Sequence, residues 1–223
     1  MNLRQSVSRT TWDELVLSGT RRTFLPGAPL MRQGESPTFV IALTEGTVKI
    51  TEDTVDGQQI PWALRGPGEL LGEKGVLLDR SRTMSVWAVT RCVGHTLPAP
   101  TFRSLVERCN LHPAIYRFSA LRSLQRERHL HNLLCHATDV RMARLLTQLA
   151  EDVGEPYARA TIIHTGMDHA ELGFMLKMSR ATASEALRRL KSHKLIESGR
   201  KSIKVLDKDA LANYTPQELP NVS

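Results

Sequence analysis

The sequence is poor in cysteine and has no long apolar run. Its three cysteines, Cys92, Cys109 and Cys135, are odd in number and far apart. This pattern predicts reduced, mostly packed thiols rather than a disulfide framework or a metal cluster. No stretch reaches the length of a membrane span, and the first residues do not have the pattern of a signal peptide. We therefore expect a cytoplasmic protein that has no membrane partner.

Catalytic patterns are also missing. The sequence shows no nucleophile–base pairing, no metal-ligand spacing and no Gly-rich phosphate loop of the nucleotide-hydrolase kind. His129, His131 and His136 are the nearest approach to a metal set. Residues two apart on a helix point to different faces, so we expect solvated or interface histidines and no metal site. The sequence therefore predicts a binding protein rather than an enzyme.

Residues 168–190 carry the clearest pattern that is present. Asp168 and Glu171 have the spacing of a capping box, and Ser179 is a favourable N-cap for a second helix. Gly173 permits the two helices to approach closely. The second helix has one apolar face, formed by Ala183, Leu187 and Leu190, and a polar face formed by Arg180, Ala181, Ser184, Glu185 and Arg188. This form predicts a helix-turn-helix that enters the DNA major groove, with an ordinary helical hairpin as the alternative.

Positive charge gathers around this helix pair. The chain has a net charge of +7. Residues 167–208 hold 10 Lys and Arg against 5 Asp and Glu, whereas residues 1–111 hold 13 against 11 and residues 112–166 hold 7 against 5. A basic surround is what a phosphate-binding face requires.

Short strand-like runs separated by turn residues dominate residues 21–97. Asp56-Gly57 is a hairpin turn signal, and many short strands with regular turns predict a sandwich or barrel. Before the strands, Thr11 and Glu14 have capping-box spacing for a short helix that ends at Leu17.

Helices follow the strands. From about Pro113 to His136 the apolar residues form a narrow stripe, which predicts a dimer seam, with packing on the protein's own barrel as a compatible alternative. Residues 140–152 form a second amphipathic helix, on which Arg141 and Arg144 face outward.

A strand–turn–strand pattern over residues 193–206 ends the organised part of the chain, with Arg200 and Lys201 at its tip, and a short helix follows over residues 207–211. We predict an α+β protein of three parts. Residues 1–111 form a β-barrel effector domain, residues 112–138 form a dimerisation helix, and residues 139–223 form a winged helix-turn-helix.

A barrel, a long helix, a helix-turn-helix and a wing, in this order, resemble the bacterial cyclic-AMP receptor protein and fumarate–nitrate regulator family (Crp/Fnr). Residues 25–35 and 39–49 are similar to the start of its cyclic-nucleotide-binding barrel, of the double-stranded β-helix (jelly-roll) type. Residues 68–86 are similar to its phosphate-binding cassette, and residues 172–205 to its winged helix-turn-helix. The resemblance covers nearly the whole chain.

The resemblance implies an effector site in the cassette. Gly72 opens a short helix whose N–H groups can face an anion, and Arg82 and Thr83 can bind a cyclic phosphate. Glu73 can accept a hydrogen bond from a ribose 2′-hydroxyl. The implied effector is cyclic AMP or another cyclic nucleotide. The alternative is that the cassette is only a structural relic and binds no nucleotide.

The base end of this site departs from the family pattern. Lys74 stands where the nucleotide binders usually have an apolar residue. Where the cyclic-AMP receptor offers small hydroxyl residues to adenine, the long helix offers Arg126, Glu127 and Arg128. We take Arg126 and Glu127 as the candidate contacts and leave open a different base, a larger nucleotide or an empty pocket. The absence of Cys from residues 1–91 argues against an oxygen-sensing iron–sulfur centre.

The resemblance also assigns DNA contacts. Ser179, Thr182 and His169 touch phosphate, and Arg180 reads a guanine through two hydrogen bonds. Glu185 either accepts from a cytosine amine or holds Arg180 or Arg188 in place. The remaining predicted contacts are Ser184, Arg188, Arg200 and Lys201.

We therefore predict a homodimeric, sequence-specific transcription regulator that binds a pseudo-palindromic operator in double-stranded DNA. A small effector controls it, dimerisation uses residues 113–136, and RNA polymerase is a candidate partner. A ligand-independent regulator of the same type is the first alternative. The second is a cyclic-nucleotide-binding regulatory subunit of a partner enzyme, against which the wing argues.

Overall fold

A computed structural model describes residues 2–215 of the chain. The protein divides into two compact units, Met1–Glu127 and Arg128–Ser223. The domain boundaries expected at residues 111 and 138 stay a prediction. Within the described residues, no helix is both long and apolar enough to cross a membrane.

The N-terminal unit begins with a 3-10 turn, η1 (Leu3–Gln5), and a helix, α1 (Arg9–Leu17). The helix ends where the sequence predicted, but the predicted cap at Thr11 is wrong. Ser8 is the N-cap, because its side-chain oxygen accepts a hydrogen bond from the Thr11 backbone N–H at 3.1 Å. Trp12 and Leu15 are the buried residues of this helix.

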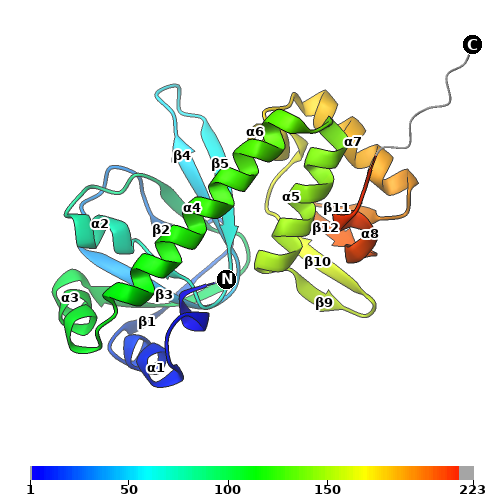
Figure 1. Ribbon diagram of the computed structural model, residues 1–223. Coiled ribbons are helices and arrows are strands. Elements are labelled where there is room, and N and C mark those ends of the chain that lie inside the picture. Colours follow the sequence, from blue (N-terminus) through cyan, green and yellow to red (C-terminus); the bar gives the residue numbers. More distant parts are fainter. Residues whose placement is uncertain (1, 216–223) are drawn as a thin grey trace, which may run out of the picture. The chain divides into compact units, whose positions relative to one another are not determined.

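Eight strands form the barrel of this unit (Figure 1). They are β1 (Thr20–Phe24), β2 (Pro29–Met31), β3 (Phe39–Glu45), β4 (Val48–Asp53), β5 (Gln59–Arg65), β6 (Leu70–Leu71), β7 (Ser85–Ala88) and β8 (Cys92–Pro98). One antiparallel sheet has the order β1-β8-β3-β6 and the other has the order β2-β7-β4-β5. The hairpin predicted at Asp56-Gly57 joins β4 to β5. The expected barrel class is thereby confirmed.

Two apolar clusters hold the unit together. Between the two sheets, Ile41, Leu43 and Val86 form the centre of one cluster. The second cluster lies where helices meet the outer face of the first sheet, and Phe102 and Phe118 are fully or almost fully buried in it. Phe102 belongs to α3 (Ala99–Arg108). Between β6 and β7 the chain forms one short helix, α2 (Glu73–Leu78), which carries the predicted cassette.

The long helix predicted over residues 113–136 is α4 (His112–Cys135). Its large exposed apolar side chains are Tyr116, Leu124, Leu130 and Leu134, and Leu134 is 84% exposed. Its inward residues Ile115 and Phe118 pack in the second cluster of the barrel. The helix therefore carries both a face packed on its own barrel and exposed apolar side chains.

The C-terminal unit joins a helical bundle to a four-stranded antiparallel sheet. Its helices are α5 (Thr138–Val153), α6 (His169–Met175), α7 (Arg180–Ser192) and α8 (Lys208–Ala212). Its strands are β9 (Glu155–Tyr157), β10 (Ala160–His164), β11 (Ile196–Gly199) and β12 (Ser202–Val205), in the order β11-β12-β10-β9. The wing predicted from the sequence is β11–β12, and β9 and β10, which the sequence analysis missed, extend it to a full sheet.

We predict that Phe102→Ala lowers the free energy of unfolding of the N-terminal unit by about 3–5 kcal/mol, because it leaves a cavity in a closed core. All three tryptophans, Trp12, Trp62 and Trp87, lie in this unit, so urea denaturation followed by tryptophan fluorescence reports on it. Leu78→Ala is the control, since Leu78 is 68% exposed. A loss below about 1 kcal/mol for Phe102→Ala would show that the core is not closed there.

Candidate functional site

The cassette is organised around the buried guanidinium of Arg82, which is 6% exposed. One terminal nitrogen donates to the Gly72 carbonyl at 2.7 Å, and the other donates to the Phe39 carbonyl. Gly72 adopts a left-handed conformation with φ of 82°, and a Cβ there would collide with the Arg82 guanidinium. Glycine is thus required both by the backbone and by the close approach of the arginine.

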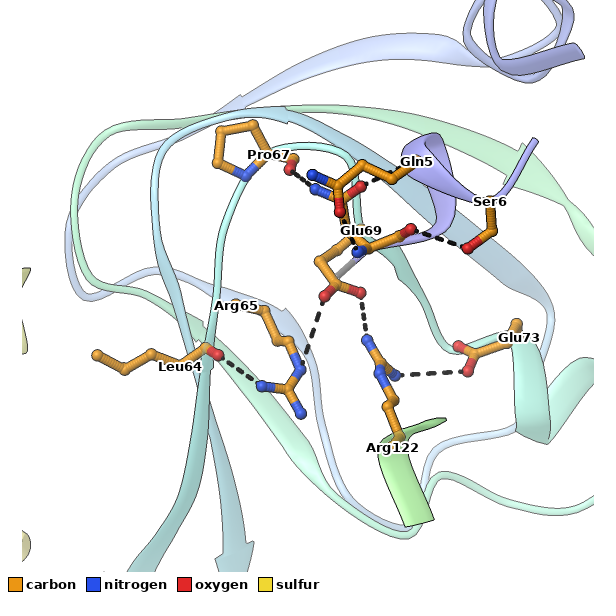
Figure 2. A network of polar contacts seen from close by, with 9 residues as sticks. Gln5, Ser6, Leu64, Arg65, Pro67, Glu69, Glu73 and Arg122 are labelled. Atoms are coloured by element: carbon orange, nitrogen blue, oxygen red, sulfur yellow. Dashed lines mark hydrogen bonds and ion pairs between the residues drawn. The ribbon is translucent and has the colours of Figure 1, made fainter. Parts of the chain in front are cut away.

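Four charged side chains form a second layer of the same site (Figure 2). Arg122 of α4 donates to the Glu69 carboxylate and lies 3.7 Å from Oε1 of Glu73. Arg65 approaches the other oxygen of Glu69 at 3.8 Å. Glu69 and Glu73 are 6% and 4% exposed. Burial raises the pKa of Glu69, and the charges of Arg122 and Arg65 partly offset this rise.

Several buried polar atoms of this site have no hydrogen-bond partner in the described part of the chain. Among them are Nε of Arg82, a donor, and Oε1 of Glu73, an acceptor. Leaving buried polar atoms unsatisfied costs free energy, so such atoms mark places where a ligand or water completes the site. A donor for an anion beside an acceptor for a hydroxyl suits the phosphate and ribose of a nucleotide, and the residues present therefore fit that ligand.

The other predicted effector residues lie at the rim of the site or beyond it. Thr83 is exposed beside Arg82, and Arg126 and Glu127 are exposed on α4, where Arg126 donates to the Ser123 hydroxyl at 2.9 Å. Partial desolvation lowers the pKa of Lys74, and the charges of Arg126, Arg122 and Arg65 lower it further, against the opposite effect of Glu73.

Arg122, Glu69 and Arg65 were not among the site residues predicted from the sequence. Arg122 precedes Arg126 by four residues, so it lies one turn earlier on the same side of α4. The four-residue spacing from Arg126 could have identified Arg122 from the sequence. The roles of Arg126 and Glu127 stay predictions.

The helix-turn-helix of the C-terminal unit has the local structure that its sequence predicted. Asp168 and Glu171 form the capping box of α6, and Ser179 caps α7 by accepting from the Thr182 N–H at 3.1 Å. Gly173 is buried at the crossing, where a Cβ would lie 2.7 Å from the Met178 carbonyl oxygen. Ala183, Leu187 and Leu190 are buried, as expected for the apolar face of α7. These contacts fix the angle between the two helices.

The predicted DNA-contacting side chains lie on the helix pair and at the wing tip: His169 begins α6, the other helical residues lie at the start of α7 (Ser179, Arg180, Thr182) or farther along it (Ser184, Glu185, Arg188), and Arg200 and Lys201 lie at the tip. Arg180 and Lys201 are exposed, and the positive charge of each helps to lower the pKa of Asp168, behind the larger effect of its backbone hydrogen bonds. His169 and Ser184 are joined across the helix pair by a contact of 2.8 Å between Nδ1 and Oγ. The start of α7 and the wing tip therefore lie near one carboxylate.

Glu185 is held by two arginines of its own helix. Its carboxylate accepts from Nε and Nη2 of Arg188 at 2.8 and 2.6 Å, and from Nε of Arg189 at 3.1 Å. These hydrogen bonds lower the pKa of Glu185 to about 2. Of the roles predicted for Glu185, the structure favours that of holding Arg188, and it adds Arg189, which the sequence analysis did not consider.

The wing tip is anchored to the loop before α6. Lys201 has a φ of 56°, and its carbonyl accepts hydrogen bonds from the backbone N–H groups of Thr165 and Gly166 and from the Thr165 hydroxyl at 3.0 Å. Thr165 is almost fully buried. Its role had no signal in the sequence, because it depends on pairing between distant segments. Arg200 lies beside Lys201 and is exposed.

Arg141 was predicted to face outward, and this is wrong. Its guanidinium donates to the carbonyls of Leu133 and Leu176, both at 3.2 Å. His129 contacts the carbonyl of Met175 at 2.9 Å through Nε2. Both side chains therefore meet the last carbonyl groups of helices, which need hydrogen-bond donors.

Across residues 2–215, no group of three or more His, Cys, Asp or Glu side chains could hold a metal ion.

Comparison with known families finds one matching domain in each of the two units. Residues 21–109 match the cyclic nucleotide-binding domain, and residues 140–214 match the Crp-like helix-turn-helix domain. The chain is 24% identical over 190 residues to the CRP-like cAMP-activated global transcriptional regulator of Mycobacterium tuberculosis, covering 85% of each protein. It is 26% identical over 196 residues to the cyclic AMP receptor protein of Thermus thermophilus, covering 86% of this chain and 87% of that protein.

Solved structures have the same fold. FixK2 from Bradyrhizobium japonicum gives a TM-score of 0.73 at 18% identity, covering 90% of this chain and 99% of that chain. The c-di-GMP responsive global regulator CLP of Xanthomonas campestris gives a TM-score of 0.69 at 20% identity, covering 90% of this chain and 100% of that chain. The relatives are transcription regulators rather than enzymes. With a cyclic-nucleotide-binding barrel before a DNA-binding helix-turn-helix, this chain belongs to the Crp/Fnr family of transcription regulators.

Proposed function

We propose that this DNA-binding regulator is a homodimer controlled by a cyclic nucleotide in its barrel. The observation that supports an effector most directly is the pair of unsatisfied buried atoms, Nε of Arg82 and Oε1 of Glu73. Arg82 with Thr83 binds the cyclic phosphate at Gly72, and Glu73 accepts from the ribose. Two relatives are named for cyclic AMP, which supports the same ligand class.

The long helix suits the transmission of this signal. Within the N-terminal unit, Arg122 of α4 meets the carboxylates of the cassette. Within the C-terminal unit, His129 of the same helix meets the last turn of α6. A ligand that binds one arrangement of α4 more tightly than another shifts the population of the DNA-binding shape.

The exposed apolar residues of α4 support the dimer. Tyr116, Leu124, Leu130 and Leu134 leave a large apolar area in water on a single helix, and pairing with a second copy removes it. Two copies related by a two-fold axis present two α7 helices to successive major grooves, so the operator is a pseudo-palindrome. RNA polymerase is a further proposed partner, and the cytoplasm the proposed location, because the regulator acts on genes.

On the DNA, we assign base reading to Arg180, with Ser184 beside it. Phosphate contacts come from Ser179, Thr182, His169, Arg188, Arg200 and Lys201. Glu185 acts by holding Arg188 toward the backbone, since its oxygens accept from Arg188 and Arg189. Specificity therefore depends mainly on Arg180.

The first test separates base reading from phosphate binding. Operators are selected from random duplexes, and we expect two inverted half-sites. Arg180→Ala should reduce preference for the operator over competitor DNA by about 10- to 100-fold, the value of one lost bidentate base contact. Lys201→Ala should weaken both DNAs alike and lower the salt slope by about one.

Fluorescence anisotropy at several salt concentrations measures both effects. Arg144→Ala serves as the control, because Arg144 is an exposed arginine of α5 outside the predicted contacts. If Arg180→Ala keeps the full operator preference, the groove assignment of α7 is wrong. A selected site with a single half-site contradicts the dimer.

The second test concerns the effector. Calorimetric titration of the wild type with cyclic AMP and cyclic GMP should give binding heat for at least one of them. Arg82→Ala should weaken that binding by at least about 10-fold, because it removes a charged hydrogen-bond donor. Arg80→Ala is the matched control, since Arg80 is an exposed arginine two residues away in the same loop. No heat from either nucleotide would favour the ligand-independent regulator.

A further inference from the structure

Glu69 is a buried carboxylate that none of the proposed ligand contacts uses. It lies four residues before Glu73, next to the short strand β6 that leads to the cassette. It accepts a hydrogen bond from Arg122, and Arg65 lies 3.8 Å away on its other oxygen. Burial of a carboxylate is unfavourable without such partners. The burial of Glu69 between two arginines therefore indicates that this carboxylate contributes to the function of the site.

Arg122 stands between two carboxylates and hydrogen-bonds only one of them in the described structure. Its Nη2 donates to Glu69, whereas its Nη1 stays 3.7 Å from Oε1 of Glu73, beyond hydrogen-bond distance. Figure 2 shows the guanidinium of Arg122 between the two acids, with Arg65 on the far side of Glu69. Oε1 of Glu73 consequently has no hydrogen-bond donor within the described residues.

We infer that Glu69 is a positioning residue that sets the sugar specificity of the barrel. By holding Arg122, it keeps Oε1 of Glu73 open as the acceptor for a ribose 2′-hydroxyl. The site then distinguishes a ribonucleotide from its 2′-deoxy analogue, because only the ribonucleotide supplies the missing donor. This inference rests on the proposed cyclic-nucleotide site and adds to it a residue that touches no ligand.

Neutralising Glu69 should redirect Arg122. In Glu69→Gln the amide no longer balances the guanidinium charge, and the nearest remaining carboxylate is Glu73, already 3.7 Å away. A shift of less than 1 Å brings Arg122 into hydrogen-bond distance of Glu73. Arg122 then competes with the ribose 2′-hydroxyl for the Glu73 carboxylate and weakens that contact.

The experiment measures affinity for cyclic AMP and for 2′-deoxy cyclic AMP by calorimetry on the full chain. We expect the wild type to prefer the ribonucleotide by about 10- to 100-fold, the range for a hydrogen bond to a charged group. In Glu69→Gln this ratio should fall to about 3-fold or less, mainly through weaker binding of cyclic AMP.

Two further variants separate positioning from general damage. Glu69→Gln/Arg122→Met should restore the preference, because the arginine that blocks Glu73 is gone. Glu14→Gln is the matched control: Glu14 is a carboxylate of α1 that accepts a hydrogen bond from Arg108 of α3, outside the cassette, so this variant should keep the wild-type ratio. If Glu69→Gln fails to fold, as judged by tryptophan fluorescence, the double variant, which removes both charges of the pair, carries the test.

The outcomes are distinguishable. An unchanged ratio in Glu69→Gln, or a double variant that does not regain the preference, overturns the role of Glu69 and leaves the nucleotide site intact. A wild type that binds neither cyclic AMP nor its deoxy analogue overturns both the site and this inference. A wild type that binds both equally shows that Glu73 does not read the 2′-hydroxyl.

Discussion

A charged side chain can be buried only where a partner offsets the loss of hydration, and this constraint shapes both functional ends of the protein. In the barrel, Arg82 is buried against two backbone carbonyls, while Glu69 and Arg122 balance each other beside Glu73. The pairing is incomplete, since atoms of Arg82 and Glu73 lack partners in the described chain. That incompleteness supports the proposal that the barrel binds a ligand.

In the C-terminal unit, charged side chains are also paired with one another, but on a more exposed surface. Glu185 accepts from Arg188 and Arg189, and Arg189 also lies 3.7 Å from the buried carboxylate of Asp139 on α5. These ion pairs connect α7 to its support. They also engage the Glu185 carboxylate, so the exposed charged groups of α7 that stay available are mainly hydrogen-bond donors, as the proposed DNA contacts require. A donor-rich face favours guanine and phosphate.

Periodicity and capping residues made much of this architecture predictable. Asp168, Ser179 and Gly173 specify the helix pair through local chemistry, so the sequence suffices there. The family resemblance supplied the cassette residues Gly72, Glu73 and Arg82, which the structure brings together. Thr165 and Glu69 could not be found, because their partners come from distant segments and leave no local pattern. Arg141 was misjudged since its donors turn toward carbonyls that only the folded unit brings near.

Control of DNA binding by the barrel is the central claim, and linkage tests it most directly. Operator affinity is measured by fluorescence anisotropy with and without saturating cyclic AMP, and cyclic AMP affinity is measured with and without operator. We predict that both affinities rise by the same factor, within the range of about 5- to 150-fold typical of coupled sites. Cyclic AMP that binds the protein yet leaves operator affinity unchanged would contradict the account.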